Sequence, residues 1–188
     1  MLLPAKPKPK AKWTVFLTFD DGPLWGTDDV LNALKSKDVK ATFFLVGYNM
    51  TAQSMGASRI QWNKNVVRRI FDEGHCLGNH SFSHQYWYDL PNVMTMDFEN
   101  NLKPFETVLD GSIPPSFTVL ARLPGSNAWR TDDIKQDVFT RGNSTEKTCE
   151  AMANEGYLIY GWDLEWRQDQ EQHFIRNPKS MADYIIQR

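Results

Sequence analysis

Short apolar segments alternate with amphipathic helical patterns along most of this chain, and this alternation restricts the possible folds more than any other feature. The apolar segments that we predict as strands are residues 14–19, 41–46, 76–79, 117–121 and 157–162. Helical periodicity covers residues 28–37, 63–73, 97–109 and 145–154. Strands that are apolar throughout and alternate with helices are typical of a parallel sheet covered by helices. We therefore predict an α/β fold whose sheet either closes into a barrel or stays open.

Two residues bear on the ends of the predicted helices. Thr27 is expected to be the N-cap of helix 28–37, because its hydroxyl can accept a hydrogen bond from the first turn. Pro104 is expected to kink or restart helix 97–109, since proline lacks the N–H group and clashes with the preceding turn.

Polar side chains follow the predicted strands at the points where the strands end. These groups are Asp20 with Asp21, His80 with His84, Arg122, and Asp163 with Glu165. Active groups of parallel α/β proteins gather at the carboxyl ends of the strands, whether the sheet is open or closed. The sequence therefore predicts one functional site at this edge of the sheet.

The histidines indicate that the site binds a metal ion. His80 and His84 are four residues apart, and on a helical turn this spacing puts both imidazoles on one side. One Asp oxygen would complete a set of three ligands and leave positions open for water and substrate, as in catalytic sites. Zinc suits these ligands best, although cobalt or nickel would also bind. The alternative, that Asp20 and Asp21 merely begin a turn, does not explain why the histidines follow a strand as well.

Composition and charge limit the class of protein. The chain of 188 residues predicts one domain, and 41% hydrophobic residues are enough for a core. A net charge of −2 gives no field that favours nucleic acid or an anionic membrane. We find no apolar run long enough to span a bilayer, and Met1-Leu2-Leu3 is too short to be the apolar core of a signal peptide. Residues 1–12, rich in Pro and Lys, are expected to be a linker or a trimmed N-terminus. Cys76 and Cys149 are expected to be free, buried thiols.

Three motifs resemble those of the polysaccharide deacetylase family, the NodB-homology domain of carbohydrate esterase family four. The motifs are Thr18-Phe19-Asp20-Asp21-Gly22-Pro23, His80-Ser81-Phe82-Ser83-His84 and Arg122-Leu123-Pro124. The resemblance extends from about Trp13 to Trp166 and implies a single domain over residues 13–188. It implies a distorted (β/α) barrel, here without its last strand. It also implies removal of acetyl groups from N-acetylated polymers such as peptidoglycan or chitin, and sometimes from O-acetylated xylan.

The resemblance assigns roles to the residues of these motifs. It makes Asp20 the catalytic base, Asp21, His80 and His84 the ligands of one divalent metal ion, and Arg122 the residue that holds the base. It also makes the N–H of Gly125 a donor to the oxyanion. These assignments agree with the chemistry, since a carboxylate beside a metal-bound water can take its proton.

Aromatic residues around these motifs are candidates for contact with the sugar polymer. The family commonly has an aromatic residue after Pro124, where this chain has Gly125, so one wall of the groove is either missing or supplied by Trp129. Tyr86 and Trp87 either stack on sugar rings or pack a corner of the barrel. Trp166 belongs to a fourth motif, in which Asp163 and Glu165 would point to the same face of a strand. Glu165 is favoured as the acidic residue of that motif.

The general acid has no clear candidate. The family's late strand, which ends in a histidine, has no match, and residues 181–186 are expected to form the helix before it. We therefore expect weak deacetylation from a chain that ends at Arg188 unless another residue is the acid. His173 is the remaining candidate, although a solvated side chain is the simpler interpretation.

These observations leave three hypotheses for the function. The first is a metal-dependent polysaccharide N-deacetylase that acts outside the cytoplasm on an N-acetylglucosamine polymer. The second is a homologue with impaired catalysis that binds glycans, and the third is a hydrolase for a small amide or ester. The oligomeric state stays open.

Overall fold

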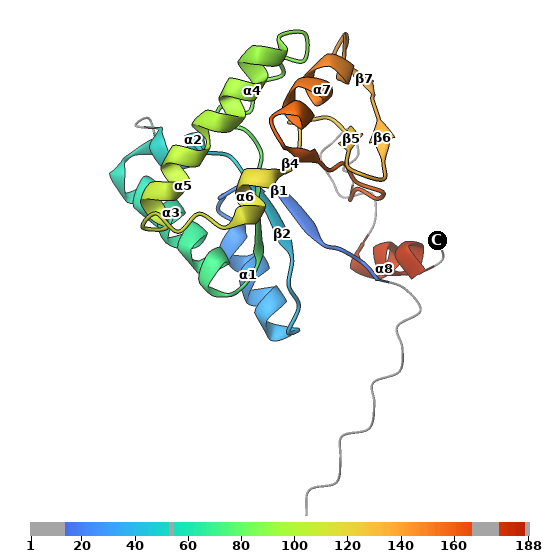
Figure 1. Ribbon diagram of the computed structural model, residues 1–188. Coiled ribbons are helices and arrows are strands. Elements are labelled where there is room, and N and C mark those ends of the chain that lie inside the picture. The colour runs from blue at the N-terminus through green and yellow to red at the C-terminus, as the bar shows by residue number, and fades with distance from the viewer. Residues whose placement is uncertain (1–13, 53–54, 167–176, 187–188) are drawn as a thin grey trace, which may run out of the picture.

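A seven-stranded sheet, mostly parallel, forms the centre of the molecule. The computed structural model describes residues 14–52, 55–166 and 177–186. In these residues the strand order is β1-β2-β3-β4-β9-β5-β6 (Figure 1). The strands are β1 (Thr18–Gly22), β2 (Thr42–Leu45), β3 (Cys76–Asn79), β4 (Leu120–Ala121), β5 (Trp129–Arg130), β6 (Lys135–Gln136) and β9 (Leu158–Ile159). β1 to β4 and β9 are parallel, while β5 and β6 are antiparallel. The predicted α/β fold is confirmed, and the sheet does not close into a barrel within these residues.

The first strand lies further along the chain than predicted. Thr18 pairs with Thr42, and the register then shifts so that Gly22 pairs with Leu45. The prediction of residues 14–19 was wrong for residues 14–17, because the neighbouring strand β2 begins only at Thr42. The irregular pairing after Phe19 marks a bulge, which bends a strand and re-aims its side chains. Asp20 and Asp21 therefore lie within the end of the strand, and Asp21 has a left-handed φ of 67°.

The sheet is covered by helices of very different lengths. They are α1 (Thr27–Ser36), α2 (Tyr48–Thr51), α3 (Ala57–Asp72), α4 (Pro91–Asn100), α5 (Leu102–Val108), α6 (Pro115–Val119), α7 (Glu146–Asn154) and α8 (Pro178–Ile186). The short helices α2 and α6 were not predicted, and α3 begins earlier than the predicted residue 63. The Thr27 prediction was wrong, since Gly26 is the N-cap of α1. The Thr27 hydroxyl accepts a hydrogen bond from Leu24 N–H instead.

The helix predicted over residues 97–109 is two helices. α4 ends at Asn100 and α5 begins at Leu102, so the chain restarts just before Pro104. Proline is tolerated in the first turn of a helix, where its missing N–H has no intrahelical partner to lose. Asn101 separates the two helices, and its buried amide donates to Leu45 O and to Asn79 Oδ1. The expectation of a restart is confirmed.

The strand predicted over residues 117–121 is mostly helix. Two consecutive prolines precede it, and Pro115 is the first residue of α6. Proline at this position has a φ suited to a helix start. Only Leu120 and Ala121 remain for β4, whose Ala121 pairs with Asn79 of β3. Phe117 nevertheless lies in the core, because it is fully buried against Phe105.

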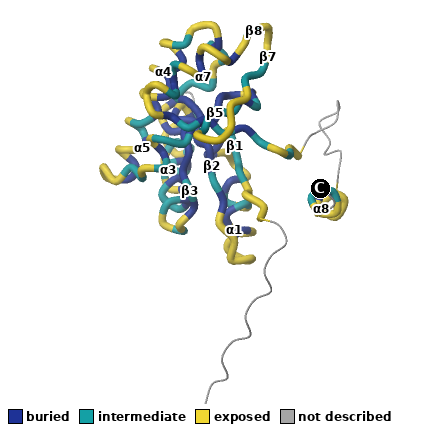
Figure 2. The backbone as a smooth tube through the Cα atoms, turned by 45° about the vertical axis from the view of Figure 1, so that its right-hand side comes forward, coloured by how far each residue is buried: buried dark blue, intermediate teal, exposed yellow. Residues whose placement is uncertain are grey.

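Two apolar clusters make up the core. Figure 2 shows that the buried segments of the backbone lie in the interior of the molecule. The first joins residues of α1, β2, α3, β3, α5 and α6, and the second joins residues of α4, β4, α7 and β9. Cys76 is half-buried and Cys149 is buried, and both are free thiols as expected. None of the helices within the described ranges is long and apolar enough to cross a membrane.

Candidate metal centre

Asp21, His80 and His84 meet at the carboxyl ends of β1 and β3. Asp21 Oδ1 lies 3.2 Å from His80 Nε2 and 2.9 Å from His84 Nε2. One ligand atom from each residue can be chosen so that all three lie within 4.8 Å of one another. The structure thus brings together the three residues predicted to hold a metal ion.

The loop that carries the two histidines is not a helical turn. Ser81 and His84 both have left-handed backbone angles, with φ of 66° and 57°. The Asn79 side chain accepts a hydrogen bond from Ser81 N–H, and Ser81 Oγ accepts one from His84 N–H. The assumption that helical spacing aligns the imidazoles was therefore wrong. Side-chain hydrogen bonds hold a tight loop that reaches the same result.

The protonation of His80 provides a test of whether these residues fit a cation. His80 is almost fully buried, and its Nδ1 lies 2.7 Å from the carbonyl oxygen of Arg122. A carbonyl only accepts hydrogen bonds, so Nδ1 carries the proton and Nε2 of the neutral ring carries a lone pair. That lone pair faces the carboxylate of Asp21, and two acceptors at this distance repel each other unless a proton or a metal ion lies between them.

The charge of Asp21 also indicates that these residues fit a cation. When no ion is bound and both histidines are protonated at Nε2, their hydrogen bonds hold the pKa of the Asp21 carboxyl far below its usual range. A bound cation would favour the ionised carboxylate in the same way, in place of the two protons. The carboxylate is therefore ionised, as a metal ligand must be. An ionised carboxylate and two imidazoles, one of them fixed with Nε2 free, fit a divalent cation.

Asp20 belongs to a separate pair beside this cluster. Its carboxylate accepts a hydrogen bond from Arg122 Nη1 at 2.9 Å, and the same nitrogen donates to Thr18 Oγ1. The Arg122 side chain is 4% exposed. Burial lowers the pKa of its guanidinium, while Asp20 opposes this shift. Adjacent aspartates thus have different partners, because the bulge and the left-handed Asp21 turn their side chains in different directions.

Pro124 and Gly125 lie at the rim of the site. Tyr88 is fully buried, and its hydroxyl donates to the carbonyl of Pro124. Gly125 has a left-handed φ of 61°, and a Cβ there would lie 2.9 Å from Tyr86 Cε1. Its N–H makes no hydrogen bond within the described residues, so it is free to serve a ligand. Tyr86 lies where a side chain at position 125 would need space, which explains why a glycine suits this position.

The other predicted aromatic residues have different surroundings. Trp129 lies in β5 and packs edge-on against Tyr160, with its indole close to Gly161. Trp87 packs against the second core cluster, whereas Trp166 is 44% exposed. Tyr86 contacts His84 edge-on, with ring centroids 5.6 Å apart. Tyr86 is thus the aromatic residue in direct contact with the candidate metal ligands.

The two acidic residues of the fourth motif are not in a strand. β9 ends at Ile159, and Asp163 and Glu165 are exposed in the segment that follows. The prediction that they share one face of a strand was wrong. Arg122, whose donors reach Tyr160 and Gly161, bonds to neither carboxylate. His173 lies outside the described residues.

Several supporting residues were not predicted from the sequence. Asn49 of α2 donates to the carbonyl of Asp21 at 2.8 Å, and the buried Asn63 donates to Asn49 O. Asp97 accepts hydrogen bonds from the N–H and hydroxyl of Ser83 in the histidine loop. No local pattern marks these residues. Their side chains bind residues that are distant in the sequence, so the sequence alone does not reveal them. Thr18, which accepts a hydrogen bond from Arg122, is the exception, because it belongs to the first motif.

The fold and the site define an α/β protein with a candidate metal centre at the carboxyl edge of its sheet. Comparison with known proteins narrows this class. The family model for polysaccharide deacetylases matches residues 7–143. The chain belongs to the polysaccharide deacetylase family, and the resemblance inferred from its motifs is confirmed.

Several relatives are similar over large parts of the chain. A chitin disaccharide deacetylase from Vibrio alginolyticus is 27% identical over an alignment of 205 positions, which covers 82% of this chain and 48% of the relative. A peptidoglycan-N-acetylglucosamine deacetylase from Bacillus cereus is 41% identical over 103 residues, covering 54% of this chain and 33% of the relative. The structure of the peptidoglycan deacetylase PdaC from Bacillus subtilis has a TM-score of 0.61 at 23% identity, covering 92% of this chain and 68% of that one. The chain spans half or less of the length of these two curated relatives.

Proposed function

We propose that this protein is a metal-dependent hydrolase that removes acetyl groups from an N-acetylated polysaccharide. The observation that carries this proposal is that the adjacent residues Asp20 and Asp21 have different partners. Asp21 lies with two histidines in a cluster that fits a cation, while Asp20 stands beside it, held by Arg122. The names of the relatives, which include chitin and peptidoglycan deacetylases, support the same activity.

The ion that Asp21, His80 and His84 would hold is divalent, with zinc the best match and cobalt or nickel as alternatives. When bound, such an ion lowers the pKa of water and polarises a carbonyl group. Asp20 takes the proton of the attacking water, and the hydrogen bond from Arg122 holds and orients the Asp20 carboxylate. The Gly125 N–H, which has no partner within the described residues, donates to the developing oxyanion.

The substrate and the setting follow from the same proposal. We propose a polymer of N-acetylglucosamine, such as peptidoglycan or chitin, as the substrate, and a site of action outside the cytoplasm. Tyr86, Pro124 and Gly125 would contact the sugar that loses its acetyl group, with Trp129 and Trp166 further along the polymer. Residues 13–188 would form one catalytic domain. Within the described ranges, no third histidine joins His80 and His84 in the site, since His75 lies before β3.

The decisive experiment separates the base from the ligands. The protein loaded with zinc would be assayed for acetate released from N-acetylglucosamine oligomers, with metal content measured by mass spectrometry. We expect Asp20→Asn to keep one equivalent of zinc while acetate release falls at least about a hundredfold, the lower end for loss of a general base. Asp29→Asn, an exposed aspartate on α1, is the matched control and should leave both unchanged.

Other outcomes would overturn specific parts of the proposal. Loss of zinc together with activity in Asp20→Asn would mean that the roles of Asp20 and Asp21 are exchanged. A His80→Ala variant that still holds one equivalent of zinc after dialysis would contradict the ligand assignment. Glycan binding without any acetate release would favour the homologue with impaired catalysis, and release from small amides alone would favour the third hypothesis.

A further inference from the structure

A two-residue hairpin brings an arginine to the rim of the site. Strands β7 (Phe139–Thr140) and β8 (Asn143–Ser144) are antiparallel and are joined by Arg141 and Gly142. Both turn residues are left-handed, with φ of 49° and 85°, as in the type I′ turns that suit tight hairpins. The base of the hairpin is fixed by Thr145, whose N–H donates to Val138 O and whose hydroxyl accepts from Val138 N–H. The hairpin therefore presents Arg141 from a defined backbone.

Contacts place the Arg141 guanidinium close to the candidate metal centre. Its Cζ lies 3.8 Å from the centroid of the Tyr86 ring, and the edge of Tyr86 meets the ring of His84. Arg141 Nε would also lie 3.6 Å from a Cβ at Gly125. One aromatic ring thus separates the guanidinium from a proposed metal ligand, and the guanidinium borders the glycine whose N–H we assign to the oxyanion.

The charge of Arg141 is not used within the described part of the protein. Carboxylates form ion pairs with Arg68, Arg69, Arg122 and Arg130. No such pair involves Arg141 among the described residues, and the residue is exposed. The guanidinium lies over the Tyr86 ring at little cost in solvation, because an arginine is more weakly hydrated than an ammonium group. A stacked guanidinium keeps its N–H donors at the edge, where a planar anion can bind through two parallel hydrogen bonds.

We propose that Arg141 binds a carboxylate of the substrate and makes the site selective for acidic N-acetylated glycans. The carboxylate would belong to the sugar that carries the acetyl group or to its neighbour, for example as a lactyl ether or a uronic acid. This inference rests on the proposed function and narrows its substrate class. A neutral chitin oligomer would occupy the same groove without the contact to Arg141.

The test compares two substrates of equal length that differ only in the carboxylate. One is a neutral N-acetylglucosamine oligomer, and the other carries a lactyl ether on one sugar. The kcat/KM for acetate release and the Kd from calorimetry would be measured for both with zinc-loaded protein. We expect a preference of about tenfold for the acidic oligomer, the size of one charge-assisted hydrogen-bonded contact. The preference should fall to near one in Arg141→Gln, and added salt should weaken it.

Matched variants distinguish a loss of selectivity for the acidic oligomer from a general loss of activity. Arg141→Lys keeps the charge but loses the planar fork, so it should retain only part of the preference. Lys103→Gln removes one charge from an exposed position on α5, on the other side of the molecule from the hairpin in Figure 1, and should retain all of it. A wild-type protein without acidic preference would overturn the inference, and so would an Arg141→Gln variant that loses activity on both substrates equally.

The two proposals fail in different ways. If the protein releases acetate from both oligomers at equal efficiency, the deacetylase function stands and the role of Arg141 is refuted. If it releases acetate from neither, the deacetylase function fails, and the ratio of the two Kd values still decides whether Arg141 binds a carboxylate.

Discussion

The guanidinium of Arg122 reaches four acceptors at once. Its Nε donates to Tyr160 O, Nη2 donates to Gly161 O, and Nη1 donates to both Thr18 and Asp20. The group also lies over the ring of Phe44, 4.2 Å from the centroid. Only arginine offers donors in this fixed planar arrangement. Arg122 therefore joins β1, β4 and the end of β9 as well as holding the proposed base.

Replacing Arg122 with lysine tests both roles. We expect Arg122→Lys to lower the free energy of unfolding by about 3 kcal/mol, because it leaves the half-buried Asp20 carboxylate and the carbonyls of Tyr160 and Gly161 without their arginine donors. Urea denaturation would measure this loss, and acetate release should fall with it. The control is Arg68→Lys, an exposed pair with Asp110, which should cost less than about 1 kcal/mol. Equal losses in the two variants would show that Arg122 is an ordinary ion-pair residue.

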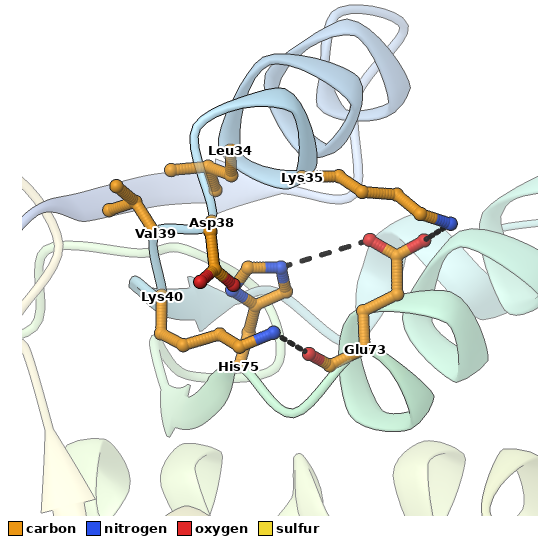
Figure 3. A pocket seen from close by; sticks show the side chains of 7 residues that line it. All are labelled: Leu34, Lys35, Asp38, Val39, Lys40, Glu73 and His75. Atoms are coloured by element: carbon orange, nitrogen blue, oxygen red, sulfur yellow. Dashed lines mark hydrogen bonds and ion pairs between the residues drawn. The ribbon is translucent and has the colours of Figure 1, made fainter. Parts of the chain in front are cut away.

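His75 lies at the opposite end of β3 from the candidate metal centre. It lines a small hollow with Lys35, Lys40 and Glu73 (Figure 3). Its Nδ1 accepts a hydrogen bond from Ala41 N–H, so the neutral ring carries its proton on Nε2. Burial lowers the pKa of His75, and the charges of Lys40 and Arg69 lower it further, while Glu73 acts in the opposite direction. The folded protein therefore keeps this histidine neutral where an unfolded chain would protonate it.

The stability should consequently depend on pH through His75. Because the folded pKa is lowered, the contribution is fully present above the unfolded pKa of about 6.5 and is lost as the pH falls below it. We expect the denaturation midpoint of the wild type to fall more between about pH 7.5 and 5.5 than that of His75→Asn. Asparagine keeps an acceptor for Ala41 N–H but does not titrate, and His80 and His84 contribute equally in both proteins. Parallel pH profiles would contradict this assignment.

At the scale of elements, the close contact between β2 and β3 requires a glycine at position 78, which has no side chain. Gly78 pairs with Phe44 across the two strands, and a Cβ at Gly78 would lie 2.5 Å from the Phe44 ring. That ring is fully buried and lies beneath the guanidinium of Arg122. An alanine at position 78 would thus disturb both the sheet and the residue that holds the proposed base.

We expect Gly78→Ala to destabilise the protein by about 1–3 kcal/mol, the usual range for overpacking a core. Thermal or urea denaturation would measure the change. Gly26→Ala is the control, because a Cβ there meets nothing within 4 Å and its φ is −78°. A Gly78→Ala variant as stable as the control would show that the Phe44 ring moves freely.

Elements with strong local patterns could be predicted, whereas those set by distant partners could not. The strand at Cys76–Asn79 is found as predicted, because the apolar Cys76 and Leu77 lie between the helix-ending Gly74 and the polar residues Asn79 and His80. Helix α6 was predicted as strand, since the β-branched and aromatic residues after Pro115 gave a β signal that the prolines overrode. The β7–β8 hairpin was missed because its strands are two residues long and mostly polar.

Across the whole molecule, which residues come together was more predictable than the backbone geometry that brings them together. The residue types of the first three motifs indicated a metal centre and a base, and the structure brings Asp21, His80 and His84 together. The contribution of Arg141 could not be predicted, because it depends on where a hairpin folds relative to Tyr86. The parallel arrangement was predictable from uniformly apolar strands, while the insertion of β9 between β4 and β5 was not.

The order of the strands in the sheet also determines which parts of the site can form first while the chain is being synthesised. β1 to β4 lie side by side in chain order, so each new strand can join an existing edge while the ribosome is still at work. The side chains of Asp21, His80 and His84, and the Arg122 carbonyl that orients His80, are all present once β4 has joined. The guanidinium of Arg122 acquires its backbone acceptor Tyr160 only 38 residues later. A nascent chain could therefore bind the proposed ion before Arg122, which holds the proposed base Asp20, has all of its acceptors.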